Sequence, residues 1–479
     1  MSKKLNTAQQ KAVCHETGPM LVLAGPGSGK TTVLLCRISR LLERGLAKPQ
    51  EILALTFSKA AAEEMKSRFE NLNGASGVSF GTFHSIFFRI LRSRYGWNVE
   101  QIFQEEERRN ILRNSIEAEK WDIPDLEEYI SQFFSQLSLM NSELEQPNRF
   151  TPTGMPVEEF RKLYRAYEGY KERHEKLDFD DMLTQCYQLL REDAAVREYW
   201  QRKYKFILVD EFQDINAAQY EAVKLLCGGK RNLFVVGDDD QAIYGFRGSD
   251  PAIMRQFLKD FPEAKQIFLS VNYRSRAGIV ETAGKLIGQN RERFPKQIVA
   301  GQSTSDERQD VCFVPEATQG ARRMQGEKST LPIPTGTASG ISTAAFGTSW
   351  LPLSTDRSVL VCGFQDRRQE AETVADEIGK TFRQGKSCAA IFRTNADAVW
   401  LATALKCRKI PFRWKEKPKN PYETPVCQDL LAYLQFAMEG RKRKDFLRIM
   451  NRPCRYLSRQ MLPDAEISFS ALRRAYAQK

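Results

Sequence analysis

MLVLAGPGSGKTT, at residues 20–32, is an apolar run that ends in a glycine-rich turn and a lysine. This pattern predicts a buried strand followed by a phosphate-binding turn, in which backbone N–H groups and Lys30 hold phosphate oxygens. FILVDEFQD, at 206–214, is a second apolar run, and it stops on the adjacent carboxylates Asp210 and Glu211. Such acids suit Mg²⁺ and an attacking water. Together the two stretches predict one nucleotide site whose chemistry is NTP hydrolysis.

The residues around these stretches alternate between strand and helix patterns. A helical pattern follows the glycine-rich turn; ILALTF (52–57) is then typical of a strand and SKAAAEEMKSRFENL (58–72) of a helix. This order predicts an α/β fold with a parallel sheet covered on both faces. From roughly 90 to 196 only amphipathic helical patterns occur, and strand patterns resume at FILVDE and at LFVVGD (233–238). We therefore expect a helical subdomain inserted into one α/β domain.

A second, weaker α/β pattern begins after about residue 280. It predicts strands at 359–363 and 388–393, and helices near 367–385 and over 395–407. Within 329–355, 17 of 27 residues are Gly, Ser, Thr or Pro. Such a composition buries too little apolar surface to order itself, so we expect a disordered insertion at about 316–357.

Charge is concentrated near the end of the chain. The net charge is +12, and residues 401–479 hold 18 Lys and Arg against 7 Asp and Glu, which is +11. A positive field favours binding to the phosphate backbone of nucleic acids, although a solvated basic surface is the simpler alternative.

Composition argues against membrane insertion and secretion. The chain of 479 residues has a mean hydropathy of −0.48 and contains no apolar run of the length that spans a membrane. The amino-terminal MSKKLNTAQQ has no apolar segment after its lysines, and the ten cysteines form no CxxC pair. We expect a cytoplasmic protein with reduced thiols and no membrane partner.

The loop AGPGSGKT (24–31) carries the phosphate chemistry, with Ala24 where the first glycine of the usual pattern stands. Lys30 would neutralise the β and γ phosphate oxygens, and the Thr31 hydroxyl would ligate Mg²⁺. A mere tight turn is the alternative, and the position between a strand and a helix argues against it. The candidate nucleotide-binding residues of this loop are Ala24, Gly25, Pro26, Gly27, Ser28, Gly29, Lys30, Thr31 and Thr32.

The acids after the second apolar run would complete the catalytic site. Asp210 would hold Mg²⁺ through water, and Glu211 would polarise the attacking water as the nearest available base. Paired acids alone usually mark a solvated strand end. Their combination with the glycine-rich loop favours the metal and water roles.

Six segments in order resemble the motifs of superfamily 1 helicases of the UvrD/Rep/PcrA type. They are LNTAQQKAV (5–13), TFSKAAAEEM (56–65), FGTFHS (80–85), FILVDEFQD (206–214), VVGDDDQAIYGFRGSDP (235–251) and LSVNYRS (269–275). The resemblance covers about residues 5–300 strongly and 359–460 more weakly. It implies ATP-driven 3′→5′ translocation on single-stranded DNA, with unwinding of duplex DNA, and a RecA-like P-loop fold.

The resemblance assigns nucleotide roles to five further side chains. Gln9 would recognise the adenine edge, and Tyr273 would stack on the base. Gln213 and Gln241 would sense the γ-phosphate. Arg274 would act as an arginine finger, since its planar guanidinium spreads transition-state charge better than an ammonium.

The resemblance also implies DNA contacts at Phe57, Tyr244, Phe246 and Arg247. Thr82 and His84, in the aromatic stretch 80–91, are further candidates, for which DNA contact and packing are equally open. In DQAIYGFRG one short loop holds an amide suited to phosphate, two rings suited to bases and a guanidinium. Packing in the core is the alternative for Tyr244 and Phe246, and helix packing is favoured for Phe87 and Phe88. For the acids of LDFDDML (177–183) we favour helix capping and salt bridges over metal binding.

The expected organisation is two RecA-like lobes with insertions. We assign 1–89 and 197–279 to the first lobe, 90–196 to the inserted helical subdomain, 280–414 to a partial second lobe, and 415–479 to the basic start of an accessory helical subdomain. Segments like HSAKGLE and a TRA-type sequence, which are late motifs of the family, are not found before Lys479. We therefore expect an incomplete second lobe, completed by a protein partner or a missing C-terminal segment.

Two functions follow from these expectations. The first is an ATP-dependent 3′→5′ DNA helicase acting in DNA repair or replication. The second is a truncated, ATP-gated single-stranded DNA-binding module with little unwinding, because loss of an arginine finger slows phosphoryl transfer by roughly 10³–10⁵. An unrelated P-loop ATPase, such as a transporter motor, fits the DNA-facing loop and the basic tail poorly.

Overall fold

The computed structural model describes residues 5–74, 77–121, 123, 125–245, 248–301, 312–315, 351–354, 356, 358–415, 422, 424–438, 440–452, 455, 457 and 464–477. The chain divides into two compact units. One comprises Met1–Val314 with Leu351–Leu360, and the other comprises Pro315–Trp350 with Val361–Lys479.

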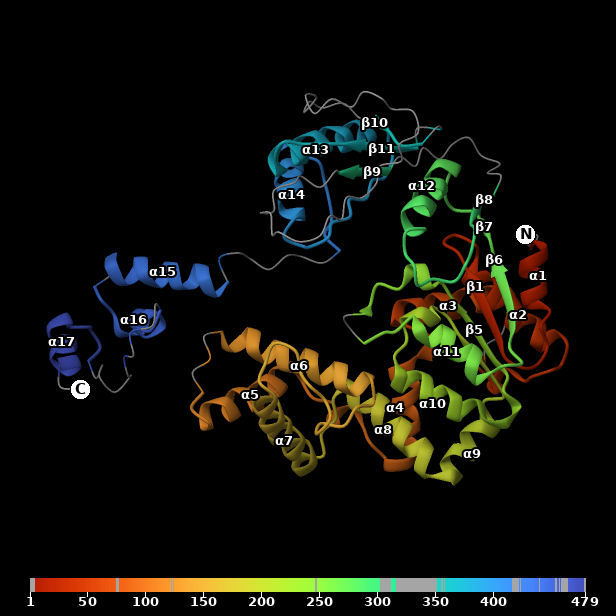
Figure 1. Ribbon diagram of the computed structural model, residues 1–479, viewed down its shortest axis with the longest axis horizontal. Coiled ribbons are helices and arrows are strands. Elements are labelled where there is room, and N and C mark those ends of the chain that lie inside the picture. Colours follow the sequence, from red (N-terminus) through yellow and green to blue (C-terminus); the bar gives the residue numbers. More distant parts are fainter. Residues whose placement is uncertain are drawn as a thin grey trace. The chain divides into compact units, whose positions relative to one another are not determined.

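Six strands form one parallel sheet in the order β3-β2-β4-β5-β1-β6 (Figure 1). Their bounds are β1 (Met20–Ala24), β2 (Ile52–Thr56), β3 (Ser79–Thr82), β4 (Phe206–Val209), β5 (Leu233–Gly237) and β6 (Lys265–Leu269). Every neighbouring pair is parallel. The strands that end at the two predicted halves of the nucleotide site, β1 and β4, are separated by β5 alone. The predicted α/β fold with a parallel sheet is confirmed.

The alternating side chains of the strands feed two separate cores, as expected for a sheet covered on both faces. Met20 and Val22 belong to one core, and Leu21 and Leu23 belong to the other. The first core includes side chains from α1 (Thr7–Val13), α2 (Lys30–Glu43) and α3 (Lys59–Asn73). The second includes side chains from α4 (Phe83–Tyr95), α8 (Phe179–Glu192), α9 (Ala194–Lys203), α10 (Ala217–Cys227) and α11 (Ala252–Asp260).

Three of the helices between β3 and β4 lie together in the chain fold (Figure 1), and their side chains build a core of their own. They are α5 (Glu105–Ala118), α6 (Leu126–Ser142) and α7 (Val157–His174). Their shared core contains the fully buried rings of Phe133, Phe160 and Tyr167. The inserted helices α5, α6 and α7 thus form a distinct packing unit, whereas α8, which also lies within 90–196, and α9, which begins at Ala194, pack in the core of the sheet.

The chain after β6 forms smaller elements. A two-stranded parallel sheet joins β7 (Val271–Asn272) to β8 (Val299–Ala300), and α12 (Ala277–Ile287) lies between them in the chain. A three-stranded sheet has the order β10-β11-β9, formed by β9 (Cys312–Pro315), β10 (Leu351–Pro352) and β11 (Val359–Cys362). The prediction of disorder at about 316–357 is wrong for Leu351 and Pro352, which form β10. Residues 316–350 lie outside the described residues.

The helices predicted near 367–385 and over 395–407 are found as α13 (Arg367–Arg383) and α14 (Ala398–Cys407), which share a small core. The strand predicted at 388–393 is wrong. These residues form no helix or strand, and Ile391 is 95% exposed. An apolar run becomes a strand only where another strand pairs with it, and no strand of the described residues does so here.

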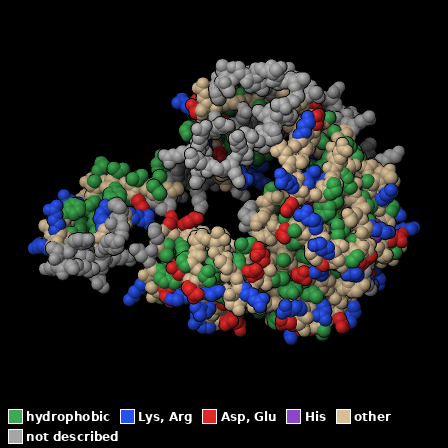
Figure 2. All heavy atoms as spheres, in the orientation of Figure 1, with side chains coloured by type: hydrophobic (Ala, Val, Ile, Leu, Met, Phe, Trp, Pro, Cys, Tyr) green, Lys and Arg blue, Asp and Glu red, His purple; other side chains and the backbone are tan. Residues whose placement is uncertain are grey.

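The last described helices are α15 (Pro425–Met438), α16 (Arg443–Ile449) and α17 (Phe469–Ala477), which pack around Phe436 and Phe446. Hydrophobic side chains gather on the surface of α15 (Figure 2). They include Val426, Leu430, Leu434 and Met438, which recur every four residues and are more than half exposed. Among the helices of the described residues, none has the length and apolarity needed to cross a membrane.

Candidate nucleotide and nucleic-acid site

The glycine-rich loop joins the end of β1 at Ala24 to the start of α2 at Lys30. Gly27 and Gly29 have φ values of +66° and +86°, in the left-handed region that favours glycine. A Cβ at Gly27 would lie 2.6 Å from Asn272 Oδ1, so the loop passes too close to β7 for a side chain. Gly29 caps α2 without a side-chain acceptor, which leaves first-turn N–H groups to an anion.

The acids follow β4 directly, at the carboxyl edge of the sheet. Thr31 Oγ1 donates to Asp210 Oδ2 at 3.3 Å, so the two predicted magnesium ligands are neighbours. Burial and the nearby charge of Glu211 raise the pKa of Asp210 to about 6. Glu211 itself has φ +52°, a left-handed conformation that a residue with a side chain rarely adopts.

Lys30 and Glu211 form the central ion pair of the site. Lys30 Nζ lies 2.6 Å from Glu211 Oε2, and it also donates to Gln241 Oε1 at 3.5 Å. Gln213 Nε2 donates to the same Glu211 oxygen at 2.9 Å. The structure therefore brings together four predicted site residues from the start of α2, the segment after β4 and the turn after β5.

Gln213 continues this network to the turn after β5. Its Oε1 accepts from the backbone N–H of Asp238 at 2.9 Å, while Gln241 Nε2 donates to Asp238 Oδ2. Asp214 lies beside Gln213, and burial, followed by the charge of Glu211, raises its pKa to about 6. The two glutamines thus share Asp238 as a common partner, a residue that was missed from sequence.

The residues predicted to bind the adenine base contact the backbone of the glycine-rich loop. Gln9 is buried in the first turn of α1, and its Nε2 donates to the Ser28 carbonyl at 2.9 Å. Tyr273 N donates to the Gly27 carbonyl at 3.0 Å, and the Tyr273 side chain is 55% exposed. Asn6 Nδ2 donates to the Tyr273 hydroxyl at 2.8 Å. Asn6 was missed from sequence, although its capping box with Gln9 was a readable signal.

Arg274 follows Tyr273 on an exposed turn whose backbone is held by Asn272. Asn272 Oδ1 accepts from the N–H groups of Arg274 and Ser275, each at 2.8 Å. Asn272 is buried, and it also lies against Gly27. It was likewise missed from sequence. Its place between the loop and the arginine gives it a structural role in both.

Two of the aromatic residues predicted to contact DNA stack on each other. The ring centroids of Phe57 and Tyr244 are 4.8 Å apart with an interplanar angle of 24°. Both side chains are partly exposed, so Tyr244 is not a fully buried core ring. Phe246 and Arg247, predicted for the same interface, lie outside the described residues.

Thr82 and His84 begin α4. Thr82 Oγ1 accepts from Ser85 N at 3.3 Å and caps the helix. The His84 ring meets Phe179 edge to face at 5.9 Å between centroids, and burial lowers the pKa of His84. Phe87 is fully buried in the core and Phe88 packs against it, so helix packing explains both rings as expected.

The acids of 177–183 cap a helix and form a buried ion pair. Asp178 accepts from Asp181 N at 2.9 Å at the start of α8, and Lys171 Nζ donates to Asp181 Oδ1 at 2.7 Å. The expectation of capping and salt bridges is confirmed.

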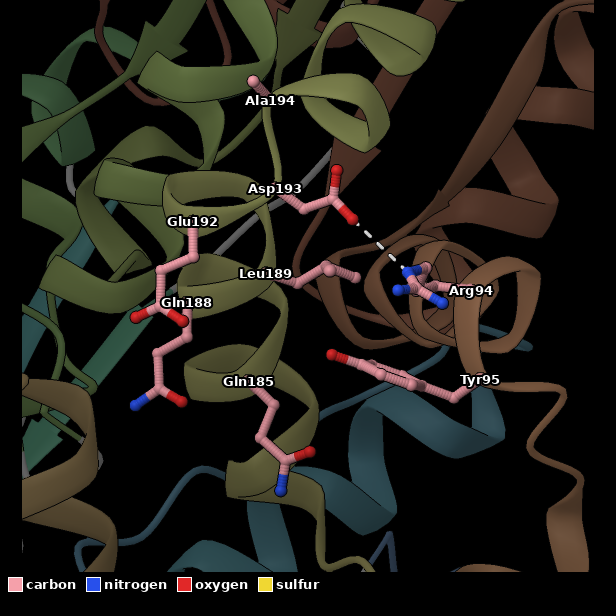
Figure 3. A pocket seen from close by; sticks show the side chains of 8 residues that line it. All are labelled: Arg94, Tyr95, Gln185, Gln188, Leu189, Glu192, Asp193 and Ala194. Carbon is pink, nitrogen blue, oxygen red and sulfur yellow. Dashed lines mark hydrogen bonds and ion pairs between the residues drawn. The ribbon is translucent and has the colours of Figure 1, made fainter.

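A polar cavity of about 520 Å³ lies at the ends of α4 and α8, away from these residues (Figure 3). Figure 3 shows Arg94 directed toward Asp193, and Arg94 Nε lies 3.3 Å from Asp193 Oδ2. None of the residues predicted for the nucleotide or for DNA lines this cavity. The cationic side chain that lines this cavity, Arg94, is thus already paired with a carboxylate of the chain.

Two family descriptions match the chain. The UvrD/REP helicase N-terminal domain matches residues 5–262, and the UvrD-like helicase C-terminal domain matches residues 346–468. The first match covers more than half of the chain and contains both the glycine-rich loop and the acidic strand end. The second covers much of the unit whose α/β pattern was weaker in sequence.

Curated proteins show the same relationship. The chain is similar to the putative ATP-dependent DNA helicase YjcD of Bacillus subtilis (strain 168), with 32% identity over 441 residues, 90% of this chain and 51% of the relative. It is 33% identical to the ATP-dependent DNA helicase PcrA of Staphylococcus epidermidis over 95% of this chain and 56% of the relative. PcrA of Staphylococcus aureus is 32% identical over 94% of this chain and 56% of the relative. The chain therefore spans about half the length of the curated relatives it matches.

Proposed function

The chain belongs to the UvrD/REP helicase family, and from this premise we propose that it binds ATP with Mg²⁺, hydrolyses the nucleotide and moves 3′→5′ on single-stranded DNA to unwind duplex. The observation that carries the proposal is the 2.6 Å contact between Lys30 of the glycine-rich loop and Glu211 of the acidic strand end. This contact joins a phosphate-binding group to a water-activating group. The proposed setting is DNA repair or replication in the cytoplasm.

The loop residues fit a triphosphate. Left-handed Gly27 and Gly29 turn the backbone, and the Ser28 hydroxyl is buried without a hydrogen-bond partner among the described residues. The first-turn N–H groups of α2 and the Lys30 ammonium would donate hydrogen bonds to phosphate oxygens. We assign the whole loop from Ala24 to Thr32 to nucleotide binding.

Thr31 and Asp210 fit a magnesium ion, because Mg²⁺ prefers oxygen ligands and retains several of its waters. Their oxygens lie 3.3 Å apart at the edge of the sheet. When bound, Mg²⁺ would neutralise charge on the phosphates. Its binding would also favour the ionised form of Asp210, whose pKa burial raises to about 6.

Glu211 is the proposed base for the attacking water. In this structure its Oε2 accepts from both Lys30 and Gln213. Phosphate oxygens would compete for the Lys30 ammonium and release the carboxylate toward water. Gln213 and Gln241, which share Asp238, are the proposed γ-phosphate sensors, and Arg274 is the proposed arginine finger.

Base recognition and DNA contact are assigned to the flanks of the site. Gln9 would bind the adenine edge, and the exposed ring of Tyr273 would stack on the base. Phe57, Thr82, His84, Tyr244, Phe246 and Arg247 are the proposed DNA contacts. Tyr244 lies three positions after Gln241, so a change of nucleotide state has a short covalent path to the DNA-facing ring.

The proposed domain assignment follows the same scheme. The first RecA-like lobe comprises 1–89 and 197–279, with the helical insertion 90–196 between its parts. The second lobe is assigned to 280–414 and the accessory helical subdomain to 415–479. We propose that a protein partner or a further segment of chain completes the second lobe.

Hydrolysis of ATP by the purified chain tests this function. ATP turnover should rise when long oligo(dT) is added, and a duplex with a 3′ single-stranded tail should be unwound in preference to one with a 5′ tail. Turnover that stays at background with long single strands would refute the helicase proposal for this chain. ATP-dependent change in oligo(dT) affinity, measured by fluorescence anisotropy, would then support the second candidate, a nucleotide-gated DNA-binding module.

A further inference from the structure

Lys296 lies among three consecutive carboxylates in the turn after β5. Its side chain is 0% exposed, its Nζ lies 3.1 Å from Asp240 Oδ2, and it also pairs with Asp238 and Asp239. Three acids this close could hold a metal ion by their geometry alone. Here the ammonium group occupies their centre, so Lys296 supplies the positive charge that the cluster requires.

A second basic residue fixes the same turn. Arg293 Nε donates to Asp240 Oδ1 at 2.8 Å and its Nη2 donates to the other oxygen, a bidentate pair. Phe294 N donates to Asp239 Oδ2 at 2.7 Å. Every carboxylate of the turn is therefore bound by the segment 293–296, which lies 53 or more positions further along the chain.

Asp238 connects this cluster to the nucleotide site. One of its oxygens is paired with Lys296, and the other accepts from Gln241 Nε2. Its backbone N–H donates to Gln213, and Gln213 donates in turn to Glu211. A continuous chain of polar contacts thus runs from Lys296 through Asp238 to the proposed sensors and the proposed base.

The residues that follow Lys296 touch the other parts of the site. Ile298 lies against the glycine-rich loop, because a Cβ at Gly25 would come within 2.7 Å of its Cδ1. Val299 and Ala300 form β8 and pair with β7, the strand that leads into Tyr273 and Arg274. The segment 293–301 therefore contacts the acidic turn, the phosphate loop and the strand β7 that leads into the arginine turn.

We propose that Lys296 is a positioning residue for ATP hydrolysis, which holds Asp238 so that Gln241 and Gln213 face the γ-phosphate. This inference rests on the proposed function and adds to it a residue outside the six recognised motifs. Lys296 acts through Asp238 and does not itself contact the nucleotide. Arg293 supports it by fixing Asp240.

The electrostatics of the cluster explain why the lysine matters. Burial lowers the pKa of Lys296, but the charge of Asp238 and hydrogen bonds to Asp238 and Asp239 outweigh it and raise that pKa above its ordinary value. The side chain therefore stays charged. Removing it would leave adjacent carboxylates that repel one another without a buried counter-ion, and the turn would open toward solvent.

The test compares Lys296→Met with wild type in two measurements. Without nucleotide, amide hydrogen exchange in the peptide covering 238–245 should become faster, while exchange in β4 stays unchanged. In steady-state hydrolysis with oligo(dT), kcat should fall by about 10–100-fold, as expected for misplaced groups. KM for ATP should stay within about threefold, because Lys30 and the loop are untouched.

Three further variants separate positioning from stability. Lys296→Arg should restore most of kcat, because it returns the buried cation. Asp239→Asn combined with Lys296→Met relieves the unpaired charge and should recover thermal stability but not kcat. Lys224→Met is the matched control: it breaks a half-buried ion pair between Lys224 on α10 and Asp260 on α11 and should leave kcat unchanged.

Unchanged hydrogen exchange at 238–245 in Lys296→Met would overturn the inference. Recovery of kcat in the double variant would also overturn it, since a purely structural role would then suffice. If wild-type protein fails to hydrolyse ATP, the proposed function fails. The exchange measurement, made without nucleotide, still decides whether Lys296 holds the turn.

Discussion

At the scale of single residues, the Lys30 ammonium connects phosphate binding to water activation. It is only 11% exposed and is paired with Glu211 before any nucleotide is present. A triphosphate that binds the ammonium would leave Gln213 as the remaining hydrogen-bond donor to Glu211 Oε2 among the described residues. The same lysine therefore serves for binding and for release of the base.

Lys30→Ala tests the first of these roles. Loss of the ammonium removes charge-assisted hydrogen bonds to phosphate, each worth about 1.5–3 kcal/mol, so ATP affinity should fall by at least about tenfold. Titration with a fluorescent ATP analogue measures this. Lys66→Ala is the control, because Lys66 forms an exposed ion pair with Glu70 on α3. This variant should bind ATP as the wild type does. Equal affinity in Lys30→Ala would contradict the assignment of the loop.

Glu211→Gln tests the second role. The amide keeps the size of the side chain but does not accept the proton of the attacking water, so kcat should fall by about 10²–10⁴. ATP affinity should be retained or should rise, because Lys30 loses its anionic partner and becomes fully available to phosphate. Single-turnover hydrolysis and equilibrium titration give the two numbers. A variant that hydrolyses ATP at the wild-type rate would exclude Glu211 as the base.

Asp210 should make stability depend on pH. Its folded-state pKa of about 6 lies above the ordinary value of 3.8, so the folded protein binds more protons than the unfolded chain between these values. Protonation of Asp210 therefore raises the free energy of unfolding as pH falls from about 6 toward 4. Above about pH 6 the buried carboxylate is charged and lowers the free energy of unfolding. Without Mg²⁺, Asp210→Asn should be more stable than wild type at pH 7.5 by about 1–3 kcal/mol. Urea unfolding at pH 5 and 7.5 measures this, and an equal difference at both pH values would contradict it.

At the scale of elements, the apolar strands and their alternation with helices along the chain were readable from sequence. Leu21 and Leu23 lie in one core and Met20 and Val22 in the other, so a strand covered on both faces is apolar at every position, as the run at 20–24 is. The loop between β1 and α2 was readable because glycines with positive φ leave a sequence signature. Local pattern and global fold agree in these elements.

The wrong and missed predictions at this scale concern contacts between segments that are distant in sequence. The run 388–393 has the composition of a strand, but periodicity does not reveal whether a partner strand lies beside it. Lys296, Asn272 and Asn6 were missed for a related reason. Each has a contact with a residue distant in sequence, which for Asn272 is Gly27, and only the folded chain shows those contacts. Asn6 alone carried a local signal, its capping box.

The turn after β5 should control DNA affinity through Tyr244. Its ring stacks on Phe57 at 4.8 Å, and the two partly exposed rings offer a platform to a base. Tyr244→Ala should lower oligo(dT) affinity by about 1–3 kcal/mol, the range found for one base stacked on an aromatic side chain. ATP affinity should be unchanged. Tyr199→Ala, an exposed tyrosine on α9, is the control for general effects on the surface. Unchanged DNA affinity in Tyr244→Ala, measured by anisotropy, would remove Tyr244 from the interface.

At the scale of the whole molecule, α15 presents an apolar stripe that the described residues leave exposed. Val426, Leu430, Leu434 and Met438 lie one helical turn apart on one side, which is typical of a helix face that packs against another surface. Such a face should cause self-association at high protein concentration.

Replacing two residues of this stripe tests its effect. Leu430→Gln with Leu434→Gln should shift the protein toward monomer in sedimentation velocity, because about 1.5–3 kcal/mol of burial per leucine is lost from the contact. The core of this unit around Phe436 and Phe446 is left intact, so the melting temperature should change little. If both proteins sediment identically at all concentrations, α15 is not a contact surface.

The central claim is that nucleotide binding and DNA binding share one scaffold, joined through the turn that follows β5. A crystal structure of the chain with a non-hydrolysable ATP analogue, Mg²⁺ and an oligo(dT) strand tests this most directly. We predict the γ-phosphate within hydrogen-bonding distance of Lys30 and Gln241, and a base stacked at Tyr244 on the same turn. A complex in which that turn contacts neither the nucleotide nor the strand would contradict the account.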